Sequence, residues 1–344
     1  VVSPLEDTTR VTTIEVRNPE VGVVAAPEVA LQNNNPVGLP LQAGNTSRYI
    51  KNWCKVTQNQ FMLRIIQEGY KFQFLRSPCT KYPIVSSTKN SEKIVAINGE
   101  ISRLLSSGAI SRIRSRPNQF VSRIFIVKKA NGNNRLIIDL SKLNKIIRKN
   151  SFKMEDISTI KQLVQKNDFM CSIDLSDAFH SIKLHPSCRK FTVFEFLGHR
   201  YCFNVLPFGF TGSPRIFTKV LRIVINFLRS KGYKISSYLD DIFLCASSSV
   251  LVLEQTKVCL NLLISLGFSP NYKKSQLVPT QEIVHLGYLI NSTNMSVSIP
   301  LEKVKSTRLR AFSALRSTPS IRKLASILGL LVSHKNGFKY APLY

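Results

Sequence analysis

The chain has 344 residues, of which 44% are hydrophobic, and its mean hydropathy is close to zero. This composition supplies enough apolar side chains for a large core, so the chain is globular, and its length indicates one or two compact units. Lysine and arginine number 48 against 20 acidic residues, which gives a formal net charge of +28.

The basic excess is uneven along the chain. Residues 1–46 carry five acids and two bases, so the other 298 residues carry 46 bases and 15 acids, a net charge of +31. Such a charge repels itself unless a polyanion relieves it, and it therefore indicates a nucleic-acid partner. A membrane surface is the alternative, but no long basic amphipathic helix with aromatic anchors is evident.

The seven cysteines form no C-x-x-C pair, and the five histidines do not lie beside them at zinc-binding spacing. We therefore expect reduced thiols and an intracellular protein of the cytoplasm or nucleus. The longest apolar stretches, such as residues 324–332, are shorter than the roughly 20 residues of a membrane span, and no signal peptide is evident. Because the chain starts at Val1 rather than Met, we expect a segment of a longer polyprotein or gene.

The first third of the chain changes character twice. Residues 1–46 are rich in Val, Pro, Asn and Thr without a period, which predicts a mostly disordered linker. Near-helical spacing of apolar residues predicts one or two helices over residues 48–70. A second periodic segment, residues 92–108, predicts a helix that ends at Gly108.

Two alternating segments, residues 120–128 and 134–139, flank an Asn-Gly pair and predict a β-hairpin. The hairpin carries four basic side chains. They are either a charged edge that prevents strand-to-strand aggregation or a set of cations that closes on phosphates. These residues are Arg123, Lys128, Lys129 and Arg135.

Carboxylates occur at the ends of two further apolar segments. Asp174 closes a strand-like run, and Asp240 and Asp241 lie at the turn between residues 235–239 and 242–246. Adjacent like charges repel unless a cation lies beside them, although a solvated Asp-Asp turn is the simpler alternative. The intervening residues are enough for a helix, a hairpin and a second helix to bring the two strand ends together. Carboxylates from two neighbouring strands suit a two-metal phosphoryl-transfer site.

The remaining elements follow in order. A segment punctuated by proline and glycine, residues 206–217, leads into a helix that runs to about residue 229, with Ser213 as its N-cap and Pro214 in the first helical position. We further expect a helix over residues 250–266, a strand over 285–290 and basic amphipathic helices over 301–315 and 321–332.

Six motifs in a fixed order resemble those of reverse transcriptases, the RNA-directed DNA polymerases of the right-hand class. The resemblance covers residues 48–344 and is strongest to the enzymes of DIRS-type (tyrosine-recombinase) retrotransposons, to which the C-terminal sequence LASILGLLVSHKNGFKYAPLY is similar. The motifs are RLIIDLSKLN at residues 135–144, SIDLSDAF at 172–179, LPFGFTGSPRIF at 206–217, YLDD at 238–241, LGFSPNYKKSQ at 266–276 and HLGYLI at 285–290.

The resemblance implies an α+β fold with fingers, a palm made of an antiparallel sheet backed by helices, and a partial helical thumb. It divides the chain into a linker (1–46), an N-terminal helical extension with the start of the fingers (47–119), the fingers and palm (120–295) and a truncated thumb (296–344). Residues 303–344 contain no carboxylate, so we expect an RNase H domain to lie downstream in the full polyprotein.

The resemblance also implies roles for individual residues. Asp174 and Asp240 would be the main metal ligands and Asp241 the third carboxylate, for two Mg²⁺ ions, with Mn²⁺ as an alternative. Phe179 would exclude the 2′-hydroxyl of a ribonucleotide. The expected dNTP-binding residues are Lys129, Arg135, Asp177, Ala178, Phe179, Phe208, Gly209 and Lys273, with Lys274 as the alternative to Lys273. The expected primer or template contacts are Tyr238 and Leu239 under the primer end, and His285, Leu286, Gly287 and Tyr288 as a primer grip.

Simpler interpretations stand beside these roles. Phe179 and Tyr238 could be ordinary core aromatics, and Lys273 could lie in a solvated turn. The chain also departs from retroviral relatives, which carry glutamine at the position of Phe208, where a polar side chain would contact the incoming nucleotide.

The sequence therefore predicts an RNA-directed DNA polymerase that extends a primer with dNTPs on an RNA or DNA template. An RNA-dependent RNA polymerase is a second hypothesis, disfavoured by Phe179 and by the Tyr-Leu-Asp-Asp sequence. A catalytically silent nucleic-acid-binding remnant is a third, disfavoured because all three aspartates are intact.

Overall fold

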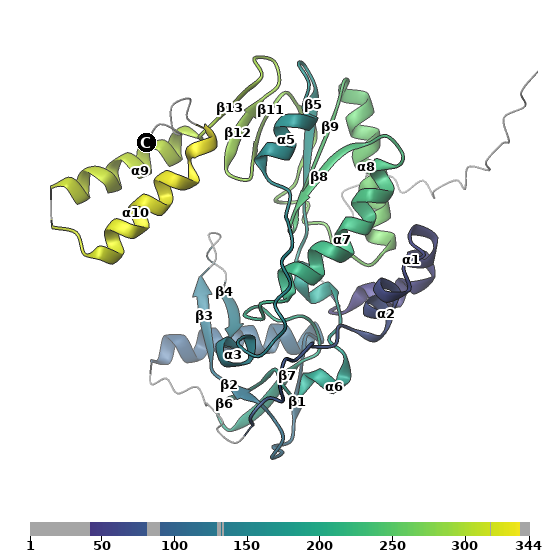
Figure 1. The fold of residues 1–344 in the computed structure, drawn as a ribbon, viewed down its shortest axis with the longest axis vertical. Helices are drawn as coiled ribbons and strands as arrows, with labels where there is room; N and C mark the ends of the chain where they lie inside the picture. Colours follow the sequence, from purple (N-terminus) through teal and green to yellow (C-terminus); the bar gives the residue numbers. More distant parts are fainter. Residues whose placement is uncertain (1–41, 81–89, 129–131, 133, 317, 338–344) are drawn as a thin grey trace, which may run out of the picture. The chain divides into compact units, whose positions relative to one another are not determined.

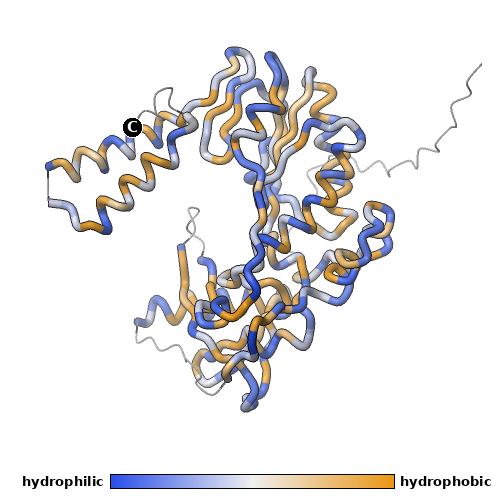
Figure 2. Tube along the Cα trace, in the orientation of Figure 1, coloured by the Kyte–Doolittle hydropathy of each residue, from blue (hydrophilic) through white to orange (hydrophobic). Residues whose placement is uncertain are grey.

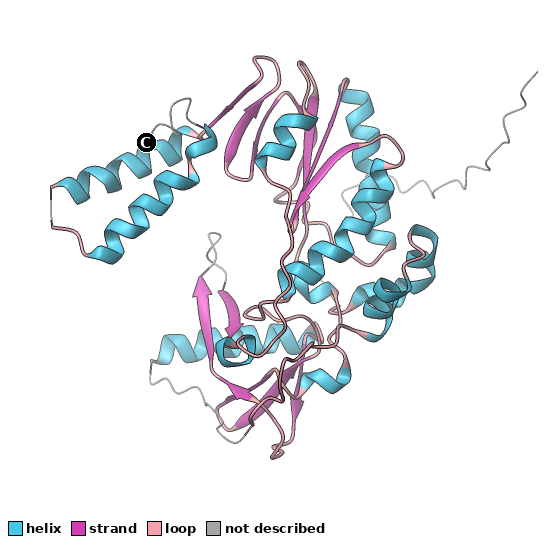
Figure 3. Cartoon of the chain, viewed as in Figure 1, coloured by secondary structure: helices cyan, strands magenta, loops and turns pink. Residues whose placement is uncertain are grey.

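The computed structural model describes residues 42–80, 90–128, 132, 134–316 and 318–337, all within one compact unit, Pro40–Tyr344. Helices and mainly antiparallel strands both occur along this unit, as Figures 1 and 3 show, and runs of consecutive strands such as β10 to β13 make the fold class α+β, as predicted. The described helices are η1 Asn45–Tyr49, α1 Ile50–Val56, α2 Gln60–Glu68, α3 Ser91–Ser106, α4 Ser141–Asn144, α5 Ile157–Leu163, η2 Ala178–Ser181, α6 Pro186–Arg189, α7 Ser213–Arg229, α8 Ser249–Ser265, α9 Leu301–Leu315, α10 Ile321–Ser333 and η3 Lys335–Gly337.

The strands form three sheets and a two-stranded ribbon. The orders are β1-β7-β6-β2, β10-β5-β9-β8, β11-β12-β13 and β3-β4. Their bounds are β1 Ile110–Ile113, β2 Val121–Ser122, β3 Ile124–Lys128, β4 Asn134–Ile138, β5 Phe169–Asp174, β6 Val193–Phe196, β7 His199–Phe203, β8 Lys234–Tyr238, β9 Asp241–Ala246, β10 Gln276–Thr280, β11 Glu282–His285, β12 Tyr288–Asn291 and β13 Ser296–Ser298.

The antiparallel sheet β10-β5-β9-β8 is the palm, and it is covered on both faces (Figure 1). Along β9, Ile242 and Leu244 belong to the main core, which includes residues of α7 and α8, whereas Phe243 and Cys245 belong to a second core with residues of α5, β11 and β12. A strand buried on both faces needs a continuous apolar run, and residues 242–246 supply one. Figure 2 shows hydrophobic stretches along these strands and along the helices that cover them.

Most helix predictions are confirmed to within about one residue. The segments 213–229, 250–266, 301–315 and 321–332 correspond to α7, α8, α9 and α10. The helix expected before Gly108 is α3, and Gly108 follows it with a φ of 74°. The described part of the chain contains no helix that is long and apolar enough to cross a membrane.

Three local predictions are wrong. The expected strand 120–128 is two strands, because at Arg123 the chain moves from β2, which pairs with β6, to β3, which pairs with β4. The Arg123 carbonyl accepts a hydrogen bond from the Asp139 amide at 2.7 Å at this break. Ser213 does not cap α7, since its buried hydroxyl donates to the Pro207 carbonyl at 2.8 Å and Gly212 occupies the cap position.

The third error concerns residues 285–290, which are not one strand. They contain the turn of a hairpin between β11 and β12, in which His285 pairs with Tyr288. Leu286 and Gly287 have φ values of 49° and 78°, the combination that a two-residue hairpin turn requires. The glycine is a turn signal, but the leucine beside it is uncommon in this conformation.

The segment Phe208–Thr211 packs closely against the fingers ribbon. Gly209 has a φ of 107°, and a Cβ atom there would overlap the carbonyl oxygen of Ile138 on β4. Asn144 of α4 holds the same loop, since its side-chain amide donates to the Gly209 carbonyl at 2.8 Å and its oxygen accepts from the Thr211 amide at 3.1 Å. Fingers and palm motifs are therefore joined at a position that only glycine fits.

We expect Gly209→Ala to lower the thermal midpoint of unfolding. The backbone conformation alone costs an alanine roughly 1–3 kcal/mol, and the overlap with Ile138 adds to this. The matched control is Gly99→Ala in α3, where a Cβ atom meets nothing within 4 Å and the free energy of unfolding should rise by roughly 1 kcal/mol. Thermal denaturation of both variants checks the prediction, and equal midpoints would contradict it.

Candidate active site

The palm sheet brings the three predicted carboxylates to one edge. Asp174 ends β5 and Asp241 begins β9, and the two are paired in the antiparallel register of these strands. Asp240 lies in the two-residue turn between β8 and β9, where Leu239 has a φ of 53°. The Asp240 carbonyl accepts a hydrogen bond from the Leu175 amide at 3.0 Å, which ties the turn to the end of β5.

The loop of residues 269–275 fixes the end of β5 from its other side. The Asp174 amide donates to the Ser275 hydroxyl at 3.0 Å, and the Asp174 carbonyl accepts from the Asn271 amide at 2.7 Å. The Ser176 amide donates to the Ser269 carbonyl at 2.8 Å. The motif LGFSPNYKKSQ thus holds the backbone that presents Asp174.

The carboxylates repel one another. Burial, which is the largest cause, and the neighbouring charges of Asp240 and Asp174 together raise the pKa of Asp241 to about 6, while Lys274 opposes the shift. Of the two lysines proposed for this loop, Lys274 is the one whose charge lowers the pKa of Asp241. Repulsion of this kind favours a bound cation or a proton.

These side chains fit Mg²⁺ as an open site. The described residues contain no group of three or more His, Cys, Asp or Glu side chains that is already gathered into a metal-binding cluster. Mg²⁺ binds through one or two carboxylates together with substrate phosphates and waters, so a complete protein cage is not required. The oxygen-only donors and the raised pKa of Asp241 suit a hard cation.

Arg135, Phe208 and Phe179 lie in a row of contacting side chains. The Arg135 guanidinium lies 4.2 Å from the centre of the Phe208 ring, and the rings of Phe208 and Phe179 are 5.0 Å apart. Phe179 also makes an edge contact with Phe217 of α7 at 5.8 Å. Phe179 is only partly buried, so it packs on the core and still has an accessible side.

The other expected dNTP-binding residues come from separate segments of the chain. Asp177 lies at a φ of 44° just before η2, and Ala178 is buried as the first residue of η2. Lys273 is exposed in the 271–275 turn, and Lys129 lies outside the described residues. Gly209 lies in the loop that packs on β4, as described above.

The expected primer-grip residues form a hairpin turn that is joined to the helical thumb. The Tyr288 hydroxyl donates to the Ser333 carbonyl of α10 at 2.6 Å, and the Lys303 amine of α9 donates to the Gly287 carbonyl at 3.2 Å. His285 is buried against Phe243, and burial lowers its pKa to about 4, so the imidazole is neutral at pH 7. Tyr238 and Leu239 lie on the other turn, beside Asp240.

No role was predicted from the sequence for three residues that the structure places in this network. Arg103 of α3 forms an ion pair with Asp177 at 2.8 Å, and Asn144 holds the Gly209 loop. Glu155 accepts hydrogen bonds from Arg229 and from Ser236 of β8. Burial would raise the pKa of Glu155, but these hydrogen bonds outweigh it and hold the pKa below its usual range. For Arg103, the only local indication in the sequence is its spacing of three residues from Glu100 on a predicted helix.

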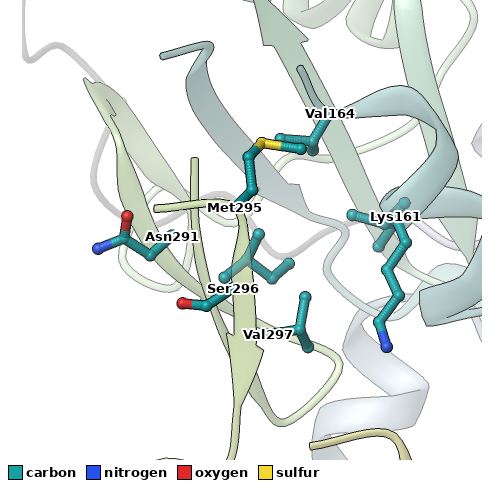
Figure 4. Close-up of a pocket in the computed structure, with 8 residues that line it drawn as sticks. Lys161, Val164, Asn291, Met295, Ser296 and Val297 are labelled. Atoms are coloured by element: carbon teal, nitrogen blue, oxygen red, sulfur yellow. The ribbon is translucent and has the colours of Figure 1, made fainter. Parts of the chain in front are cut away.

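A cavity of about 240 Å³ lies on the α5 side of the palm, between α5 and the β12–β13 hairpin. Figure 4 shows that Val164, Met295 and Val297 supply apolar walls, with Lys161, Asn291 and Ser296 among the polar lining residues. The lining contains no carboxylate, so this cavity is separate from the candidate metal site.

The palm sheet with carboxylates at the junction of two neighbouring strands is the arrangement of the right-hand polymerase fold. Residues 126–290 match the family described as "Reverse transcriptase (RNA-dependent DNA polymerase)". They form a reverse transcriptase domain of the kind found in retroviral and retrotransposon Pol polyproteins.

Relatives come from viruses and from a transposon. The Gag-Pol polyprotein of Walleye dermal sarcoma virus is 30% identical over 243 residues, which cover 70% of this chain and 13% of the relative. The Pol polyprotein of equine infectious anemia virus (strain Wyoming) is 30% identical over 71% of this chain and 22% of the relative. The Pol polyprotein from transposon opus of Drosophila melanogaster is 27% identical over 69% and 23%. The chain spans less than a quarter of each.

Solved structures agree on the fold. The foamy viral protease-reverse transcriptase in complex with RNA/DNA hybrid has a TM-score of 0.64 at 20% identity, over 83% of this chain and 39% of that chain. The same protein in complex with dsDNA has a TM-score of 0.63 at 21% identity, over 90% and 67%. The right-hand polymerase fold is therefore confirmed.

We expect Asp241 to make the metal-free protein less stable as the pH rises from 4 to 6. Its pKa of about 6 exceeds the ordinary value of 3.8, so the folded protein binds more protons in this window and the free energy of unfolding falls with pH. In EDTA at pH 7, Asp241→Asn should be more stable by about 1–2 kcal/mol, less than the full shift because the site is partly exposed.

Chemical denaturation at pH 4.5 and pH 7 measures this effect. The control is Glu254→Gln, which removes an exposed carboxylate from α8 and should leave the pH dependence unchanged. Excess Mg²⁺ should reduce the difference between Asp241→Asn and the wild type, because a bound cation offsets the repulsion. A variant as pH-dependent as the wild type would show that Asp241 does not carry the shift.

Proposed function

We propose that the chain is an RNA-directed DNA polymerase that extends a primer 3′-hydroxyl with deoxynucleoside triphosphates. The observation that carries this proposal is the pairing of Asp174 with Asp241 at the junction of β5 and β9, with Asp240 in the adjoining turn. The domain match and the Pol polyprotein relatives support the same activity.

Asp174, Asp240 and Asp241 would hold two Mg²⁺ ions, or Mn²⁺ in their place. When bound, such ions lower the pKa of the primer hydroxyl and stabilise charge on the departing pyrophosphate. The side chains of the protein position the substrates. Arg135, which lies over the Phe208 ring, would bind the triphosphate. Lys129 and the lysines of the 271–275 turn would bind it as well, and of these Lys274 is the one whose charge lowers the pKa of Asp241.

The proposed partner is a primer-template of RNA and DNA. Two structural neighbours are complexes of the foamy viral protease-reverse transcriptase, one with an RNA/DNA hybrid and one with dsDNA. Arginine and lysine side chains on the described part of this chain are in large excess, and a fingers cavity of about 460 Å³ is lined by four of them, Arg114, Arg116, Arg189 and Lys190. Cations without matching carboxylates suit a phosphate backbone.

We also propose that the chain derives from a DIRS-type element and is followed by an RNase H domain. The C-terminal sequence similarity supports this lineage, whereas Phe208 at the position of the retroviral glutamine is shared by several retrotransposon lineages and does not distinguish among them. We propose the domain limits of a reverse transcriptase for this chain. A linker extends to residue 46, an N-terminal helical extension and the start of the fingers cover 47–119, the fingers and palm cover 120–295, and a truncated thumb begins at 296. Sequencing of the adjoining gene would test the lineage, because an integrase in place of a tyrosine recombinase contradicts it.

We expect Asp174→Asn and Asp240→Asn to abolish primer extension while primer-template binding and folding persist. Each change removes a metal ligand but little packing, and it also relieves repulsion between carboxylates. Primer extension on RNA and DNA templates with Mg²⁺ is the test, and Glu254→Gln is the control for loss of one negative charge. Near-normal extension by either variant overturns the metal assignment, and an inactive wild type favours the silent-remnant hypothesis.

We expect Phe179→Ala to admit ribonucleotides. If the Phe179 ring contacts the sugar, its removal narrows discrimination between dNTP and rNTP by about 1–3 kcal/mol. Phe179→Tyr retains the ring and should retain discrimination. Incorporation efficiencies for both nucleotides decide the matter, since an unchanged ratio in Phe179→Ala would make this residue a core aromatic and reopen the RNA-polymerase hypothesis.

A further inference from the structure

A side chain of the fingers reaches the segment that carries Phe179. Arg103 lies near the end of α3, and its guanidinium donates to the Asp177 carboxylate at 2.8 Å, across 74 residues of sequence. Asp177 lies two residues before Phe179. The Asp177 side chain is 22% exposed and that of Arg103 is 40% exposed, so the pair lies at the edge of the protein rather than in its core.

Asp177 has an unusual backbone conformation. Its φ and ψ values are 44° and 42°, the left-handed region, which costs a residue with a Cβ atom roughly 1–2 kcal/mol. Aspartate relieves this cost when its carboxylate bonds locally, but Asp177 makes no side-chain cap bond to η2 and its carboxylate accepts from Arg103 instead. The turn that leads into Phe179 is therefore held from another element.

Arg103 is itself oriented before it meets Asp177. Both carboxylate oxygens of Glu100, one turn earlier on α3, accept from the Arg103 guanidinium at 3.1 to 3.3 Å. Glu100 is buried, so it restricts the arginine to one direction. Burial would lower the pKa of Arg103, but the charges of Asp177 and Glu100 outweigh it and raise that pKa. Because Glu100 already fixes one edge of the planar guanidinium, the other edge binds Asp177 with little further loss of side-chain conformational entropy.

A second connection joins the same two elements. The Ala43 amide donates to the Ser107 carbonyl at the end of α3, and the Gly44 amide donates to the His180 carbonyl in η2. The 3₁₀-helix η2 is thus linked to α3 by a backbone strap as well as by Arg103. The core contacts of Phe179 with Phe208 and Phe217 fix its ring, while these links hold the backbone before it together with the bonds from the Ser176 amide to Ser269 and from the His180 amide to Asp177.

We propose that Arg103 is a positioning residue for sugar selection, which acts through Asp177 to set the place of Phe179. The inference rests on the proposed polymerase function and extends it, because it makes selection of dNTP over rNTP depend on a fingers helix. An exposed ion pair contributes little to stability, with a typical value of about 0–1 kcal/mol. The effect of the Arg103–Asp177 ion pair is therefore local. It holds a turn in a strained conformation and so sets the position of Phe179, the residue that would meet the sugar.

The test is a double-mutant cycle of Arg103→Gln and Asp177→Asn, with Arg103→Lys as the variant that keeps the charge. The kcat and KM for dNTP and rNTP are measured on one primer-template. We expect Arg103→Gln to lower the dNTP-to-rNTP ratio of kcat/KM on the order of tenfold, mainly through a higher KM for dNTP. Arg103→Lys should restore most of the ratio. The double variant should be no worse than the more impaired single variant, because both changes break one interaction.

Arg112→Gln is the matched control. Arg112 is an exposed arginine of β1 whose guanidinium lies 2.8 Å from Nδ1 of His199, so its replacement removes the same charge without changing the Arg103–Asp177 ion pair. Its discrimination ratio should equal that of the wild type.

Two outcomes overturn the inference. If Arg103→Gln lowers the rates for both nucleotides equally, or lowers only the thermal midpoint, Arg103 is a structural residue. If the two single variants are additive in the double variant, Arg103 does not act through Asp177. A wild-type chain that extends no primer is a different result, because it removes the proposed function itself.

Discussion

The repulsion among three carboxylates at one sheet edge is the constraint on which the rest of the palm depends. Asp174 and Asp241 are forced into register by the β5–β9 ladder, and a third charge follows in the turn. An arrangement of this kind is unfavourable by itself, so it persists only where the surrounding structure fixes it. The loop 269–275, the buried face of β9 and the bond from Leu175 to Asp240 supply that fixation.

The fingers and this palm share one apolar core, and a few specific contacts join them near the site. Gly209 lets one loop approach the carbonyl of Ile138, and Asn144 bridges that loop from both sides. Arg103 and the strap at Ala43 and Gly44 make the corresponding connection on α3. The residues that would meet the nucleotide therefore lie where the two parts of the chain are connected, and they depend on both.

Local patterns predicted the elements well, because helical periodicity and alternating strands depend on neighbours in sequence. The helices α7 to α10 and the β8–β9 hairpin follow from such patterns. The sequence did not predict the Leu286-Gly287 turn, since leucine seldom adopts positive φ, nor the break at Arg123, where the chain changes sheets. The partners Arg103 and Asn144 lie 74 and 65 residues from their contacts and have no local signature. The expected roles of the site residues remain predictions.

The distribution of thiols has a consequence for the chemical behaviour of the chain. Five of the seven cysteines are buried, and burial raises the pKa of Cys245 and Cys259, which pack in the two cores on either side of the palm sheet, to about 12. A thiol reacts as its thiolate, so these two side chains are unreactive towards alkylating agents while the sheet is intact. Cys54 and Cys79 are exposed and available from the start. The rate at which an alkylating agent modifies Cys245 and Cys259 therefore measures the opening of the palm sheet, and this measurement requires no substrate.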